Sequence, residues 1–159
     1  MEYARELGAG EDRARVDAFL EERSAVHVAR LGELVDARDH PALVAEEQGR
    51  LVGVLTYVID GDRCEVLTLH AAEQRRGIGR ALMQKVQRIG GAAGCNALWL
   101  ITTNDNLDAL RFYQQRGFRL AKLHAGAVDE SRRTLKPEIP VKGEYGIFIH
   151  DELELIKEL

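Results

Sequence analysis

The chain has 159 residues, of which 45% are hydrophobic and 30% are charged, as is usual for a folded domain. Its formal net charge of −4 provides no excess of positive charge for nucleic acid or an anionic membrane, so we expect neither as a partner. No apolar run approaches the ~18 residues of a membrane-spanning helix. The charged first residues are unlike a signal peptide, so we expect a cytoplasmic protein.

The N-terminal part of the chain predicts one or two helices followed by strands. Residues 11–22 have an apolar and a charged face, which predicts an amphipathic helix. A second short helix is expected within 26–40, ending before Pro41. Three strands are then expected, at 41–46, 51–59 and 64–70, joined by turns at 47–50 and 60–62 as an antiparallel meander.

The hydrophobic period then changes to that of a helix. Apolar residues recur every three or four positions from Ile78 to Ile89, and glycines at 90–94 end this pattern. Residues 97–103 are apolar almost throughout, which is typical of a central strand covered on both faces. Strand, helix and strand over 64–103 predict a parallel pair with a right-handed crossover.

The C-terminal part predicts a helix at 107–116, capped by the polar residues 104–106, and a strand at 118–124. Residues 125–150 are expected to be an irregular, lid-like insertion before a last strand at 151–159. Within this insertion, the basic residues Arg132, Arg133 and Lys136 form either a solvated charge run or a site for an acidic group. The whole chain, 1–159, is expected to be a single α+β domain.

The segment 74–82, Gln-Arg-Arg-Gly-Ile-Gly-Arg-Ala-Leu, lies between the predicted strand and helix. A helix N-terminus presents unpaired N–H groups and a partial positive charge. Gly77 and Gly79 allow an anion to approach the backbone, and the arginines add charge around it. The segment therefore predicts a phosphate or pyrophosphate ligand, the alternative being a glycine-rich helix start that binds nothing.

Three phosphate-binding turns compete for this segment. A P-loop requires lysine and then serine or threonine after its last glycine, but Gly79 is followed by Arg80 and Ala81. A dinucleotide fingerprint requires a small residue at the position of Leu82 and an acidic residue about 20 positions further on, and neither is present. The third turn, Gln74-x-x-Gly77-x-Gly79, resembles that of the GNAT superfamily of N-acetyltransferases without a gap.

A second segment strengthens this resemblance. Asn106-x-x-Ala109-x-x-Phe112-Tyr113-x-x-x-Gly117-Phe118 resembles the second conserved block of the superfamily, and the general pattern covers residues 41–124. The tail looks like that of a bacterial subgroup of unassigned substrate. One departure is Ala71, which stands where the superfamily often has proline, close to an expected β-bulge.

The resemblance implies a GNAT fold, a central mixed and twisted sheet flanked by helices. Its parallel strands, here 64–70 and 97–103, would splay apart to admit the pantetheine arm of acetyl-CoA. The implied cofactor-binding residues are Leu69, His70 and Ala71 along the strand, Gln74, Arg75, Arg76, Gly77, Ile78, Gly79, Arg80, Ala81 and Leu82 at the pyrophosphate, and Asn106 and Tyr113 on the following helix.

The implied activity is direct transfer of an acetyl or short acyl group to a primary amine of a small molecule or peptide. The alternatives are a CoA-binding regulatory module without turnover and a partner-binding domain without cofactor. Proteins of this resemblance are commonly dimers, so a homodimer is one expectation. No metal is expected, because the cysteines Cys64 and Cys95 show neither CxxC spacing nor a neighbouring histidine pair. The alternative is that these two cysteines form a single disulfide.

Two residues are the candidates for proton transfer. Tyr113 matches the superfamily tyrosine, and a phenol with a pKa of about 10 is protonated at neutral pH and can donate to the leaving thiolate. Glu65, in an otherwise apolar strand, is the candidate base. The rival bases are His70 and His124, and His70 can share a face with Glu65 only if a bulge intervenes. Packing and pairing with an arginine are the alternative roles of Tyr113 and Glu65.

Overall fold

The computed structural model describes residues 4–7, 11–73 and 77–159. The chain divides into two compact units. The first comprises residues 1–27, 36–98 and 159, and the second comprises residues 28–35 and 99–158.

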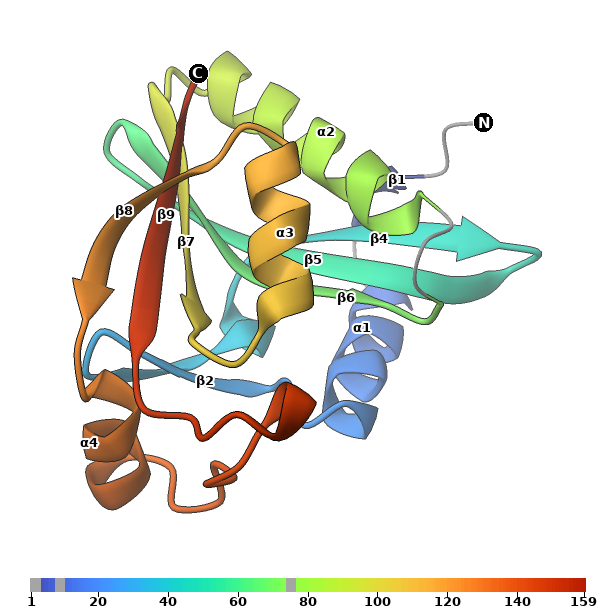
Figure 1. The fold of residues 1–159 in the computed structure, drawn as a ribbon. Helices are drawn as coiled ribbons and strands as arrows, with labels where there is room; N and C mark the ends of the chain where they lie inside the picture. The colour runs from blue at the N-terminus through green and yellow to red at the C-terminus, as the bar shows by residue number, and fades with distance from the viewer. Residues whose placement is uncertain (1–3, 8–10, 74–76) are drawn as a thin grey trace. The chain divides into compact units, whose positions relative to one another are not determined.

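After five successive strands, helices and strands alternate along the C-terminal half of the chain (Figure 1). The strands are β1 (Ala4–Glu6), β2 (His27–Arg30), β3 (Glu33–Asp36), β4 (Ala42–Glu47), β5 (Arg50–Asp60), β6 (Arg63–Ala71), β7 (Ala97–Thr103), β8 (Arg119–His124) and β9 (Glu152–Glu158). The helices are α1 (Glu11–Glu22), α2 (Ile78–Ala92), α3 (Leu107–Gln115) and α4 (Ala127–Thr134), with 3₁₀ turns at Ala37–Asp39 and Glu144–Gly146. Seven strands form a mixed sheet in the order β1-β4-β5-β6-β7-β9-β8, and β2 and β3 form a separate hairpin.

In the first unit, β1, β4, β5 and β6 pair as antiparallel neighbours. Helix α2 packs on one face of these strands, and α1 lies on the other (Figure 1). The apolar stripe of α2 is buried, as its sequence period predicts, with Ile78, Leu82 and Val86 each no more than 1% exposed. The predicted meander and the predicted helices over 11–22 and 78–89 are therefore confirmed.

A glycine on β5 fixes how closely α2 approaches the sheet. A Cβ atom at Gly53 would lie 2.5 Å from Ile78 Cγ2 and 3.0 Å from Leu82 Cδ1. A larger side chain can therefore occupy this position only if the Ile78 side chain or the first turn of α2 shifts. Because Gly53 pairs with Ala71, that first turn is packed beside the end of β6.

Strand β6 contains a bulge. Thr56 of β5 pairs with Thr68, but the next residue, Tyr57, pairs with Val66, so Leu67 is the extra residue on β6. Such an insertion reverses the alternation of side chains beyond it. The bulge forms although Ala71 replaces the proline that the superfamily often has there.

In the second unit, β8 and β9 pair as antiparallel strands, and the β2–β3 hairpin contacts β9. The hairpin turns at Leu31 and Gly32, whose φ angles are 50° and 76°. Glu152 of β9 is 2% exposed and accepts a hydrogen bond from the Leu31 backbone N–H at 3.0 Å. A buried carboxylate therefore fixes the turn of the hairpin.

Two sequence-based expectations for secondary structure are wrong. The second helix expected within 26–40 is the β2–β3 hairpin, and its apolar residues do not form a buried stripe: Leu31 and Leu34 are 37% and 44% exposed. Residues 125–150 are not irregular throughout, because they include α4, which begins after Gly126 in a left-handed conformation with φ of 73°. The short strand β1 had no counterpart in the expectations.

Candidate functional site

The first part of the candidate site is the start of α2. Gly77 is the N-cap and has φ of 80°, a left-handed conformation that favours glycine. The helix begins with a hydrogen bond from the Ala81 N–H to the Gly77 carbonyl at 3.0 Å. The N–H groups of the first turn therefore point out of the helix end, the geometry that binds anions. The predicted residues Gln74, Arg75 and Arg76 lie outside the described residues.

The remaining residues of this segment have distinct environments. Ile78 and Leu82 are buried under the helix, whereas Gly77 and Arg80 are exposed and Gly79 and Ala81 are half-buried. The exposed members thus surround the helix end, and the buried members anchor it to β5. The structure brings this turn together with the last residues of β6 in the first unit.

At the end of β6, Leu69, His70 and Ala71 are half-buried. Burial lowers the pKa of His70, and the charge of Arg23 at the end of α1 lowers it further. Arg23 is held in place by stacking on Phe19, with its guanidinium carbon 3.5 Å from the ring centroid. The imidazole of His70 is therefore uncharged at neutral pH.

The bulge at Leu67 places Glu65 and His70 on the same face of β6. Residues opposite one another in a sheet share a face, and Glu65 and His70 lie opposite Val58 and Val54 of β5. Glu65 is only 3% exposed, so its environment is not that of an exposed strand carboxylate. This face also carries a buried pair of hydroxyls, with Thr56 and Thr68 oxygens 2.6 Å apart.

In the second unit, α3 carries two predicted residues. Asn106 caps the helix, because its side-chain oxygen accepts a hydrogen bond from the Ala109 N–H at 3.3 Å. Tyr113 makes edge-on contacts with the rings of Phe112 and Phe118, at centroid distances of 5.3 and 5.6 Å. Burial raises the pKa of Tyr113 to about 12, so the phenol is protonated at neutral pH.

The turn between β7 and α3 carries polar contacts that the sequence patterns did not indicate. Asp105 is 4% exposed and accepts hydrogen bonds from the Thr103 hydroxyl at 2.5 Å and the Glu144 N–H at 3.0 Å. The hydroxyl of Tyr145 donates to Asp108 at 2.6 Å. These contacts attach the segment before β9 to the start of α3; in the sequence, residues 104–106 indicated only a helix cap.

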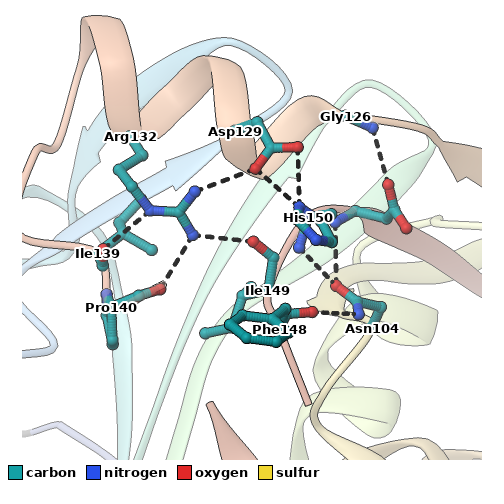
Figure 2. Close-up of polar contacts among 10 residues, drawn as sticks. Asn104, Gly126, Asp129, Arg132, Ile139, Pro140, Phe148, Ile149 and His150 are labelled. Atoms are coloured by element: carbon teal, nitrogen blue, oxygen red, sulfur yellow. Dashed lines mark hydrogen bonds and ion pairs between the residues drawn. The ribbon is translucent and has the colours of Figure 1, made fainter. Parts of the chain in front are cut away.

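Arg132 is part of a hydrogen-bonded cluster rather than a solvated charge (Figure 2). Its guanidinium donates to the carbonyls of Ile139, Pro140 and Ile149 at 3.0, 2.9 and 2.8 Å. It also donates to Asp129 at 3.1 Å. The solvated reading of this basic run is therefore wrong for Arg132, whereas the neighbouring Arg133 is exposed and pairs with Glu130.

Neither a metal-binding cluster nor a membrane-spanning helix is found among the described residues. Within residues 4–7, 11–73 and 77–159, no group of three or more His, Cys, Asp or Glu side chains is arranged to hold a metal ion. None of the helices described in the structure combines the length and hydropathy needed to cross a lipid bilayer.

Comparison with known proteins relates this arrangement to a family. Residues 2–118 match the family model described as "Acetyltransferase (GNAT) family". A Bacillus subtilis (strain 168) protein, described as "Uncharacterized protein YdhI", is 47% identical over 107 residues, which cover 67% of this chain and 66% of that protein. The chain thus spans slightly less than two thirds of that relative's length.

Two further proteins are similar to this chain. Streptothricin acetyltransferase of Streptomyces lavendulae is 30% identical over 117 residues, covering 69% of this chain and 61% of that protein. A GNAT family acetyltransferase from Elizabethkingia anophelis, solved with acetyl-CoA bound, has a TM-score of 0.70 and 19% identity, covering 98% of this chain and 97% of that one. At that identity, the likeness shows a shared fold.

Proposed function

This chain belongs to the GNAT acetyltransferase family, and from that premise we propose that it transfers an acetyl group from acetyl-CoA to a primary amine. The observation that carries the proposal is the start of α2. There, a left-handed Gly77 opens the helix, and Gly53 lets its first turn pack against β5 beside the end of β6. Acetyl-CoA supplies the thioester, and its pyrophosphate is the anion that such a helix end accepts.

The proposed cofactor contacts come from the start of α2, the end of β6 and the start of α3. The N–H groups from Gly77 to Arg80, which precede the first helical hydrogen bond of α2 from Ala81, hold the pyrophosphate. The backbone of Leu69 and Ala71 binds the pantetheine amides, and Asn106 contributes from the start of α3. The acetyl group passes directly to the amine, with no acyl-enzyme intermediate.

The proposed chemistry requires a proton donor and a proton acceptor. The amine nitrogen attacks the thioester carbon, a C–N bond forms, and the C–S bond breaks. Tyr113, protonated because its pKa is raised to about 12, donates to the departing thiolate. Glu65, buried on the polar face of β6, accepts a proton from the nitrogen.

The cofactor site is tested by thermal unfolding with and without acetyl-CoA. The cofactor should stabilise the wild type, by about 2.7 kcal/mol at 100 times its dissociation constant. Gly79→Val places a β-branched side chain in the first turn of α2 and should abolish the stabilisation without unfolding the chain. Gly91→Val is the matched control, because it makes the same change in the last turn of α2, where nothing lies within 4 Å.

Turnover is tested by release of free thiol from acetyl-CoA with a panel of amines. The panel comprises streptothricin, the compound in the name of the Streptomyces lavendulae relative, together with spermidine and a peptide with an N-terminal alanine. Acetyl transfer predicts thiol release with at least one amine. Stabilisation by acetyl-CoA without thiol release from any amine would instead favour a module that binds CoA and does not turn over.

A further inference from the structure

The segment just before β9 carries a histidine, His150, whose side chain is oriented by a hydrogen-bonded chain through Asp129 to Arg132. The His150 Nδ1 atom lies 2.9 and 3.0 Å from the two carboxylate oxygens of Asp129, on α4. Asp129 is held in turn by Arg132 at 3.1 Å, as Figure 2 shows. Because the guanidinium of Arg132 is itself fixed by three backbone carbonyls, the carboxylate and the imidazole have defined orientations.

The backbone of His150 is attached to the turn that leads into α3. The Asn104 side-chain oxygen accepts hydrogen bonds from the N–H groups of His150 and Asp151, at 2.9 and 3.0 Å. Its amide donates to the Phe148 carbonyl at 2.9 Å. Helix α3 begins directly after this turn and carries Tyr113 in its last turn, so Asn104 joins the His150 segment to the start of that helix within the second unit.

Stability alone explains this arrangement poorly. The side chains of His150 and Asp129 are 53% and 49% exposed, and ion pairs at such exposure contribute only about 0–1 kcal/mol. With Nδ1 bonded to a carboxylate, the neutral ring carries its proton on Nδ1 and presents the lone pair of Nε2 on its opposite side. That is the form of histidine that accepts protons in catalysis.

Two further residues lie close to His150 in the sequence, Asp151 and Phe148. Asp151, the next residue, accepts a hydrogen bond from the Gly126 N–H at 2.8 Å. Phe148, 54% exposed, lies with its ring centroid 6.4 Å from that of His150 and provides an apolar surface beside it. The charged group bonded to the imidazole is therefore Asp129, with Arg132 behind it, and the Lys142 ammonium lies 5.9 Å from the centroid of the Phe148 ring.

We propose that His150 removes the first proton from the ammonium form of the acceptor, with Asp129 and Arg132 as positioning residues. The inference rests on the proposed acetyl transfer. An ammonium nitrogen loses two protons in becoming an amide nitrogen. The first passes to Nε2 of His150 and then to solvent, which leaves the amine free to attack the thioester carbon. The second proton leaves as the C–N bond forms, and the C–S bond breaks, as in the acetyl transfer proposed above.

The kinetic test compares two exposed histidine–aspartate pairs. His150→Gln should lower kcat on the order of 10²-fold with little change in KM or in melting temperature. His27→Gln is the matched control, because His27 is 52% exposed and pairs with Asp36 at 3.9 Å, and it should leave turnover unchanged. Added imidazole should restore part of the turnover of His150→Ala. Full turnover by His150→Gln, with a lowered melting temperature, would show that the pair only joins α4 to β9.

A second measurement does not depend on turnover. Diethyl pyrocarbonate modifies uncharged imidazoles, and mass spectrometry reports the rate at each histidine of the wild type. If His150 deprotonates the amine that attacks the thioester, saturating acetyl-CoA should shield it from the reagent. Modification of His150 should then slow severalfold, while that of His27 stays constant. If acetyl-CoA stabilises the protein but leaves the rate at His150 unchanged, this proposal fails and the cofactor site stands. If acetyl-CoA gives no stabilisation, the proposed function fails, and this inference fails with it.

Discussion

At the scale of single residues, Tyr113 is protonated at neutral pH, as the proposed proton donor must be. Its ring is held between those of Phe112 and Phe118, and burial raises its pKa to about 12. A donor must be protonated before the reaction, so the raised pKa keeps Tyr113 competent across the neutral and moderately basic range. Activity should therefore show no loss due to this group until the pH approaches that value.

Replacing Tyr113 by phenylalanine separates the roles of its ring and its hydroxyl. If the hydroxyl donates only in the transition state, kcat and kcat/KM should fall together by about 10²-fold while KM barely changes. Thermal stability should change little, because the ring contacts remain. Tyr145→Phe is the control: it removes another hydroxyl from the second unit, one that bonds Asp108, and should leave kcat unchanged. Equal rates for wild type and Tyr113→Phe would make the tyrosine a packing residue.

The contact between α2 and β5 is the decisive feature at the scale of elements. Gly53→Ala would put a methyl group 2.5 Å from Ile78 Cγ2, so the Ile78 side chain or the first turn of α2 must shift. We expect a loss of about 1–3 kcal/mol in the free energy of unfolding and weaker binding of acetyl-CoA. Urea unfolding and a cofactor titration measure the two effects.

Gly91→Ala makes the same substitution in the last turn of α2, where no neighbouring atom lies within 4 Å. There alanine should stabilise the helix by about 0.5–1 kcal/mol and leave cofactor binding unchanged. If Gly53→Ala binds acetyl-CoA as tightly as the wild type, the packing of α2 on β5 does not position the cofactor turn.

Elements whose burial follows a clear period were predictable from the sequence. Helix α2 has one buried stripe, and β7 is an apolar run, so local pattern and tertiary environment agree. The β2–β3 hairpin was not predictable in this way. Its turn depends on left-handed Leu31 and on Glu152 far along the chain, and neither constraint appears in the local spacing of apolar residues.

The candidate site likewise contains features that a local motif predicts and features that depend on distant partners. The glycine turn at Gly77 and the tyrosine at position 113 were identified because short motifs specify them. The bulge at Leu67 and the cluster of Asp129, Arg132 and His150 depend on partners in other elements. Long-range contacts of this kind leave no local motif, so the sequence indicated only a basic run and an irregular segment there.

At the scale of the whole molecule, the buried Glu152 connects stability to pH. Burial raises its pKa, although the Leu31 N–H and the charges of His124 and Arg30 act in the opposite direction. A carboxyl with a raised folded-state pKa stabilises fully below its unfolded value of about 4.5, and that contribution is lost as pH rises through the folded-state pKa. At neutral pH, the ionised group therefore costs stability.

Glu152→Gln removes this charge and keeps an oxygen that can accept from Leu31. The variant should be more stable than the wild type at neutral pH. The difference should disappear near pH 4, where the wild-type carboxyl is also neutral. Urea unfolding at both pH values checks this, and a variant that is equally destabilised at both would show that the hydrogen bond, rather than the charge, dominates.

The central claim, that the whole chain transfers an acetyl group to an amine, is tested most directly by following that group. The wild type is incubated with acetyl-CoA that carries a stable isotope in its acetyl group and with each amine of the panel, and mass spectrometry quantifies the products. We predict that at least one amine gains the labelled acetyl group, in equal amount to the CoA released, and that Gly79→Val forms no such product. A wild-type protein that acetyl-CoA stabilises, but that labels none of the amines, would contradict the account.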